Sequence, residues 1–124
     1  MKYLCLAFYD PARLAAMPPE DVRALVGQCP AKDAELKASG QLRVSASLGG
    51  ADKAVSIRPR SGWPEVKDGP FAEAKEVVGG FFIIEAATPE EALQVACLHP
   101  AATLGERAGW GIEVHPIGMY LEHE

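Results

Sequence analysis

Two side chains of this sequence are the best candidates for acid–base chemistry, Asp68 and His115. Asp68 opens the run Asp-Gly-Pro, and His115 stands near the end of an alternating stretch that begins at Ile112. A carboxylate and an imidazole on one partly buried face can exchange protons near neutral pH, because burial and a neighbouring charge shift both pKa values. If the protein is an enzyme, we expect Asp68 to act as base or anchor and His115 as proton carrier.

Both residues also have structural explanations. Asp-Gly-Pro is typical of a turn or helix start, in which the carboxylate accepts a main-chain N–H bond. Pro70 has no N–H, so the N–H of Phe71 is the expected donor. His115 and Glu113 can equally form a solvated strand edge or a cross-strand salt bridge. The sequence leaves these interpretations open beside the catalytic ones.

Further side chains are predicted to contact a ligand, because they fall on strand faces expected to lie away from the helices or beside the Asp-Gly-Pro turn. No nucleotide-binding loop and no metal-ligand spacing occurs, so neither a cofactor nor a metal site is predicted. The predicted ligand-binding residues are Tyr3, Arg58, Phe71, Glu85 and Glu113.

Residues 1–9 alternate with the period of a β-strand that has two different apolar faces. The side chains of Leu4, Leu6 and Phe8 are predicted to pack on helices. That assignment places Tyr3, Cys5, Ala7 and Tyr9 on the helix-free face.

Helix signals follow in two places. A short turn or helix from Asp10-Pro11 precedes a long helix from about Pro19 to Gly40, which Pro30 is expected to kink or split. Asp33 falls on the apolar stripe of that helix and is interpreted as an exposed rim residue. Thr88, Pro89 and Glu91 predict a second helix with a capping box, which ends by His99 and Pro100.

The remaining apolar stretches predict strands at residues 42–48, 54–60, about 63–67, 81–86 and 112–117. The order is that of a ferredoxin-like α+β fold, β-α-β-β-α-β with a hairpin insertion, in one domain over residues 1–124. Its antiparallel sheet carries helices on one face. The apolar helix-free face then predicts a homodimer, because a monomer seldom leaves so much apolar area exposed.

Composition narrows the class of protein. The net charge of −5 argues against nucleic-acid binding, which generally needs a basic patch. The apolar run before Asp10 is too short to span a membrane and has no cleavage site, so neither a membrane protein nor a signal peptide is expected. Three cysteines, Cys5, Cys29 and Cys97, match neither a disulfide framework nor a zinc site. Reduced thiols and a cytoplasmic location are the simplest interpretation.

Residues 68–76 read Asp-Gly-Pro-Phe-Ala-Glu-Ala-Lys-Glu, and Gly79-Gly80-Phe81-Phe82 and Thr88-Pro89-Glu90-Glu91 follow. In these motifs the chain resembles the DGPF branch of the YCII-related proteins, nearly over its whole length. The resemblance implies a dimeric α+β barrel. It also implies a catalytic pair of a histidine in the first helix and a later aspartate, but the histidine position falls at Cys29, so the pair is not carried over intact. DGPF-like proteins often occur together with sigma factors of the extracytoplasmic-function class, so the resemblance also leaves a regulatory role open.

Three functions remain open. The first is binding of a small molecule in the cleft of a dimeric α+β barrel. The second is a cofactor-independent enzyme that uses Asp68 and His115, with Cys29 as a possible thiolate for which no basic partner is evident nearby. The third is a regulatory module that acts through another protein.

Overall fold

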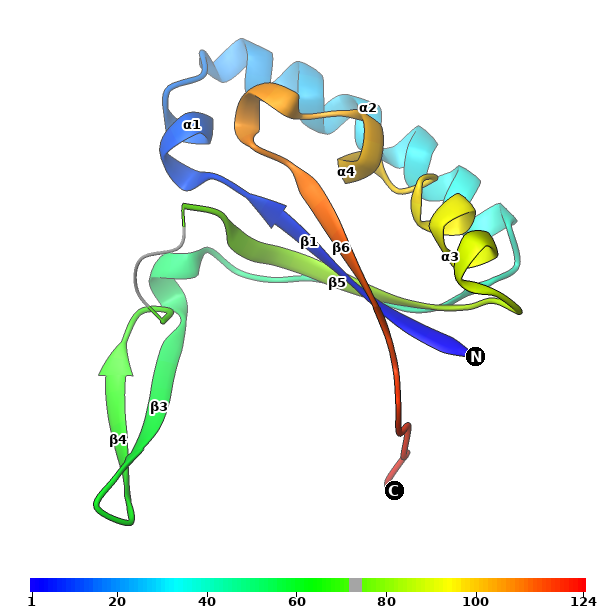
Figure 1. Ribbon diagram of the computed structural model, residues 1–124. Helices are drawn as coiled ribbons and strands as arrows, with labels where there is room; N and C mark the ends of the chain where they lie inside the picture. Colours follow the sequence, from blue (N-terminus) through cyan, green and yellow to red (C-terminus); the bar gives the residue numbers. More distant parts are fainter. Residues whose placement is uncertain (72–74) are drawn as a thin grey trace.

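The computed structural model describes residues 1–71 and 75–124, and Ala72, Glu73 and Ala74 of the Asp-Gly-Pro-Phe motif lie outside the described residues. A four-stranded antiparallel sheet has the order β2 (Leu42–Ser47), β5 (Val77–Glu85), β1 (Lys2–Tyr9), β6 (Gly111–Pro116). The helices are α1 (Pro11–Ala15), α2 (Pro19–Ala38), α3 (Pro89–Ala96) and α4 (Pro100–Thr103), with 3₁₀ turns η1 (Ala51–Lys53) and η2 (Glu106–Ala108). Figure 1 shows the helices on one face of this sheet.

The predicted α+β class and ferredoxin-like order are confirmed. Counting only the sheet strands, the first pairs with the third and the fourth, and the second occupies an edge beside the third. The predicted hairpin insertion consists of β3 (Val55–Arg60) and β4 (Trp63–Asp68), which follow β2 and precede β5 in the sequence. The two strands form a separate two-stranded sheet. In Figure 1 this hairpin projects from the body on the side away from the helices, as does the C-terminal segment.

The predicted facing of β1 is wrong. Tyr3 is 2% exposed and Cys5 fully buried, and both belong to the core with Phe82 and Ile84 of β5. This core packs against Leu36 of α2 and residues of α3, so Tyr3 and Cys5 point toward the helices. By alternation and register, the opposite or open face carries Leu4, Leu6, Phe8, Val44, Ala46, Phe81, Ile83, Glu113 and His115.

The helix starts follow the sequence signals closely. Asp10 is the N-cap of α1, accepting from Ala12 N at 3.0 Å, and the Thr88 hydroxyl accepts from Glu91 N at 3.1 Å at the start of α3. The Glu91 carboxylate does not complete the expected capping box. It accepts from Gln41 Nε2 at 2.6 Å and so ties α3 to the start of β2.

The sequence predicted that Pro30 would kink or split the long helix. The predicted split is wrong, since α2 continues as one helix through this residue. Pro30 is exposed on the outer side of the helix. Water can therefore solvate the carbonyl that its missing N–H leaves unpaired, and packing of Leu25 and Leu36 holds the two halves on the body.

No helix in the described part of the chain combines the length and the apolar composition that crossing a membrane requires.

Candidate functional site

A cavity of about 730 Å³ lies between α2 and the sheet, and we call it the helix-side cavity. Segments far apart in the sequence form its wall: the ends of β1 and β2, the C-terminal half of α2, the start of β5, and the α3–α4 junction. Ordinary ligand pockets fall in this size range. The polar and aromatic side chains that line it include Tyr9, Cys29, Asp33, Ser45, Ser47, His99 and Trp110.

His99 is the titratable group most firmly positioned in this wall. Its ring stacks on Phe82, with centroids 4.6 Å apart and planes 1° from parallel. Its Nδ1 accepts from Ala101 N at 3.0 Å and caps α4. The proton of the neutral ring is then on Nε2, which remains available to donate to a ligand. Burial lowers the pKa of His99, against a smaller opposing effect of the Asp33 carboxylate, so the ring is neutral at pH 7.

Asp33 also acts on Cys29, one turn earlier on α2. The Cys29 thiol donates to the Leu25 carbonyl at 3.7 Å. Burial, followed by the charge of Asp33, raises the pKa of Cys29, which favours the thiol over the thiolate. Cys29 is therefore arranged as a wall of the cavity and poorly arranged as a nucleophile. Asp33 is exposed, as expected for a rim residue, and it lies on the rim of this cavity.

Two glycines allow the aromatic side chains to reach the cavity. A Cβ on Gly79 would come within 2.8 Å of the Tyr9 ring, at the β-bulge where β1 and β5 shift register. The ring of Trp110 occupies the space that a Cβ on Gly105 would need, and Gly105 has a φ of +74°, which glycine adopts without strain. The shape of the cavity thus depends on residues with no side chain of their own.

The predicted acid–base pair is not brought together. Asp68 ends β4, in the projecting hairpin, whereas His115 is on β6, an edge strand of the four-stranded sheet. His115 Nε2 lies 2.9 Å from Glu113 Oε1, and both side chains are exposed. This is the solvated strand edge that the sequence left open as an alternative. The catalytic roles of Asp68 and His115 stay predictions, without support from their positions.

The predicted ligand-binding residues are also dispersed. Tyr3 is in the core, so it cannot contact a ligand on the helix-free face to which it was assigned. Glu85 forms ion pairs with Lys2 at 2.8 Å and Arg43 at 3.1 Å, which lower the pKa of Glu85. Glu113 is on the open face as predicted.

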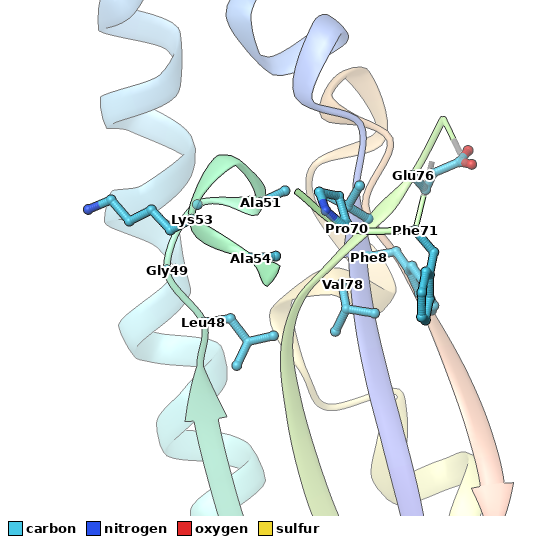
Figure 2. A pocket seen from close by; sticks show the side chains of 12 residues that line it. Phe8, Leu48, Gly49, Ala51, Lys53, Ala54, Pro70, Phe71, Glu76 and Val78 are labelled. Carbon is cyan, nitrogen blue, oxygen red and sulfur yellow. The ribbon is translucent and has the colours of Figure 1, made fainter. Parts of the chain in front are cut away.

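Arg58 and Phe71 meet at the base of the projecting hairpin. The Arg58 guanidinium lies 4.1 Å from the centroid of the Phe71 ring, a cation–π geometry. Phe71 in turn lines a second hollow of about 480 Å³, which we call the arm-base recess. Figure 2 shows its predominantly apolar lining, with Phe8, Leu48 and Val78 among the residues, and the Lys53 chain extending away from it.

Among the described residues, no three His, Cys, Asp or Glu side chains are grouped so as to hold a metal ion. The helix-side cavity is lined by hydrogen-bonding and aromatic side chains.

Sequence reasoning did not find His99, because a histidine before a proline at a helix end needs no function. The local signal was present: a side chain preceding Pro100 and a further short helical stretch is in an N-cap position. Its partner Asp33 is 66 positions away, and no pattern in the sequence connects the two.

Comparison with known proteins agrees with this architecture. The model of the YCII-related domain matches residues 1–112. The chain belongs to the YCII-related family. An uncharacterized protein of Rhizobium meliloti (strain 1021), R00369, is 30% identical over 124 residues, covering 100% of this chain and 98% of the relative. Membership of the DGPF branch within the family stays a prediction.

A solved structure shares the YCII-like fold. It is the 5-chloro-2-hydroxyhydroquinone dehydrochlorinase TftG of Burkholderia phenoliruptrix AC1100, in complex with 2,5-dihydroxybenzoquinone. The similarity has a TM-score of 0.50 and 19% sequence identity, and covers 94% of this chain and 93% of that one. At this identity the likeness concerns the fold.

Proposed function

We propose that this protein binds a small organic molecule in the helix-side cavity and that it does so as a homodimer of the α+β-barrel kind. The observation that carries the proposal is the convergence of His99, Asp33, Tyr9 and Trp110, from four separate segments, on one cavity. Convergent polar groups in a largely apolar hollow are typical of ligand sites. A single domain over residues 1–124 in each subunit stays a prediction, and so does a cytoplasmic location, which rests on the cysteine pattern.

Planar hydroxylated rings are the ligand class to test first. The cavity offers aromatic surface from Tyr9 and Trp110 and an Nε2–H donor from His99. TftG, with a similar fold, is in complex with 2,5-dihydroxybenzoquinone. This molecule is therefore a suitable first probe.

Thermal unfolding with and without 2,5-dihydroxybenzoquinone tests the proposal. A ligand present at a hundred times its Kd stabilises the native state by about 2.7 kcal/mol. The protein should carry Cys97→Ser, because quinones react with exposed thiols. Ser47→Trp, which fills the cavity, is expected to abolish the rise in Tm, whereas Ala87→Trp, at an exposed site outside the cavity lining, should retain it. An equal rise in both variants would place the ligand elsewhere.

The homodimer is supported by the open face, where Leu4, Leu6, Phe81 and Ile83 form a continuous apolar surface across the two central strands. Burial of such a surface by a second copy is favourable at roughly 25 cal/mol per Å². Sedimentation analysis should return twice the chain mass of 13.2 kDa. The mass of a single chain at all concentrations would reject the dimer.

An enzyme of the acid–base kind is the second candidate, and the pairing of a neutral His99 with the nearby Asp33 favours it. A neutral imidazole with its proton on Nε2 can donate a hydrogen bond to a developing oxyanion, and the Asp33 carboxylate that lines the same cavity can accept the proton that the substrate loses. His99→Asn tests this, because asparagine also serves as an N-cap but lacks the Nε2–H. Loss of turnover with retained folding supports catalysis; ligand binding without any turnover in the parent protein supports binding alone.

A further inference from the structure

The projecting hairpin, residues 55–68, which we call the arm, exposes an apolar face. Its cross-strand pairs place Val55, Ile57 and Val66 on one face together with Pro59 and Pro64. Ile57 is 60% and Val66 61% exposed. An isolated two-stranded hairpin is marginal in water, so an arm of this composition is expected to be covered in the working protein. It leaves the body on the side away from the helices, and its own sheet does not cover it.

The tip of the arm carries the most exposed aromatic side chain of the described residues. Trp63, directly after the turn at Ser61-Gly62, is 76% exposed. Trp63 pairs with Arg60 across the hairpin, and Arg60 forms an exposed ion pair with Glu65 at 2.9 Å. An exposed tryptophan at the end of an arm is typical of an anchor that enters a pocket on another molecule.

The base of the arm provides a pocket of matching character. The arm-base recess is lined by Phe8, Leu48, Phe71 and Val78, and Figure 2 shows these side chains around the hollow. Arg58, stacked on Phe71, fixes one wall of the recess to the arm. The recess opens beside Phe8 of the open face. It shares Phe8, Leu48, Gly49 and Gly50 with the lining of the helix-side cavity, so the two hollows adjoin at the ends of β1 and β2.

Charge favours a second copy of this chain as the occupant. The arm carries three basic and two acidic side chains, whereas the rest of the chain carries nine basic and fifteen acidic ones. The arm thus has a net charge of +1 and the rest of the chain a net charge of −6, so contact between the arm and the body of another copy is electrostatically favourable. Each copy presents one tip and one recess, so two equivalent contacts about a two-fold axis close the assembly at a dimer.

We propose that the arm clasps a second copy of this chain, with Trp63 of each copy inserted into the arm-base recess of the other. The strands of the arm span roughly 20 Å, a length sufficient to reach across the facing sheet of a small domain. The inference rests on the proposed homodimer and names the surfaces that hold the two copies together. The occupant of each recess is then Trp63 of the other copy.

Fluorescence of Trp63 tests the insertion directly. The chain has two tryptophans, so Trp110→Phe leaves Trp63 as the single reporter. As concentration rises and dimers form, its emission is expected to shift to the blue and become protected from acrylamide quenching. A dimer in which Trp63 keeps the emission of a water-exposed indole overturns the inference, whatever the other variants do.

Variants in sedimentation analysis test the energetic role. Trp63→Ala is expected to raise the dimer Kd at least about tenfold, as for a central aromatic anchor. Ala54→Phe, which fills the recess, should have a similar effect, and the two losses should not add in the double variant. The matched control is Leu93→Ala, an exposed apolar residue on α3, which should leave the Kd unchanged.

Failure of this inference differs from failure of the proposed function. A dimer unaffected by Trp63→Ala and Ala54→Phe rejects the clasp and leaves the sheet-to-sheet dimer standing. A wild-type protein that stays monomeric rejects both. Quinone-induced stabilisation that survives in the Trp63→Ala variant separates the arm from the ligand site.

Discussion

The four-stranded sheet and the arm both consist of antiparallel strands with an apolar face, but only the sheet has a cover within the chain. Phe82 and Ile84 of β5 are buried beneath α2 and α3, while Ile57 and Val66 of the arm remain exposed. The difference lies in connectivity. In the sheet, β1 is linked to β2 and β5 to β6 through helices that return over the same face, whereas β3 and β4 are joined only by a tight turn.

This contrast separates the residues that stabilise the fold of one subunit from those that are available to bind another molecule. Side chains under the helices determine the stability of each subunit and shape the helix-side cavity. Side chains on the arm contribute little to the fold of their own subunit and are available for contact with another molecule. The following substitutions test that division, from the largest expected effect to the smallest.

Phe82→Ala should destabilise the protein by about 3–5 kcal/mol, because it empties a site that is 1% exposed and removes the ring on which His99 stacks. Val66→Ala, on the arm, is the counterpart and should change the free energy of unfolding by less than about 0.5 kcal/mol. Urea denaturation at a protein concentration that keeps the chain monomeric measures both. Comparable losses would show that the arm is part of the cooperative core.

Gly79→Ala should cost about 1–3 kcal/mol and weaken binding in the helix-side cavity, since the new Cβ would displace the Tyr9 ring. The control is Gly111→Ala on β6, where no atom lies within 4 Å of the new Cβ. Thermal unfolding with and without the quinone probe measures both effects. Unchanged binding in Gly79→Ala would mean that Tyr9 does not contact the ligand.

The smallest effect concerns pH. Burial lowers the pKa of His99 below the ordinary value of 6.5, so the unfolded chain binds a proton at a higher pH than the folded protein does. The stability contributed by neutral His99 is fully present above pH 6.5 and is lost as the pH falls from 6.5 through the folded-state pKa. His99→Asn should remove this component from the pH dependence of the free energy of unfolding. An identical pH profile in the variant would contradict the assignment.

Much of the fold was predictable because its signals are local. Thr88 and Asp10 cap helices from adjacent residues, and the apolar alternation of residues 112–117 correctly predicted that Glu113 and His115 share a face. The ferredoxin-like order follows from the succession of these elements. Pro30 was misjudged because its cost depends on whether the carbonyl it leaves unpaired meets water, which only the packed helix decides.

The candidate site was not predictable to the same degree. Asp68 and His115 are the most conspicuous polar residues of their motifs, and the fold keeps them on separate sheets. The sequence marked Asp33 only as a rim residue of its helix and His99 only as the end of another, and packing of α2 beside α4 brings both to one cavity. Chemistry between distant residues depends on tertiary contacts that sequence spacing does not encode.

The N-terminal strand, β1, shows both what the sequence determines and what only the tertiary structure decides. Its alternation alone determined that Tyr3 and Cys5 share one face and Leu4 and Leu6 the other. Both faces are apolar, so burying either face beneath the helices would be favourable. Hydrophobicity alone therefore did not indicate which face meets the helices. Only the tertiary structure decided, because side chains from α2 and α3 must fill the space above Tyr3 and Cys5 at the density of a protein core.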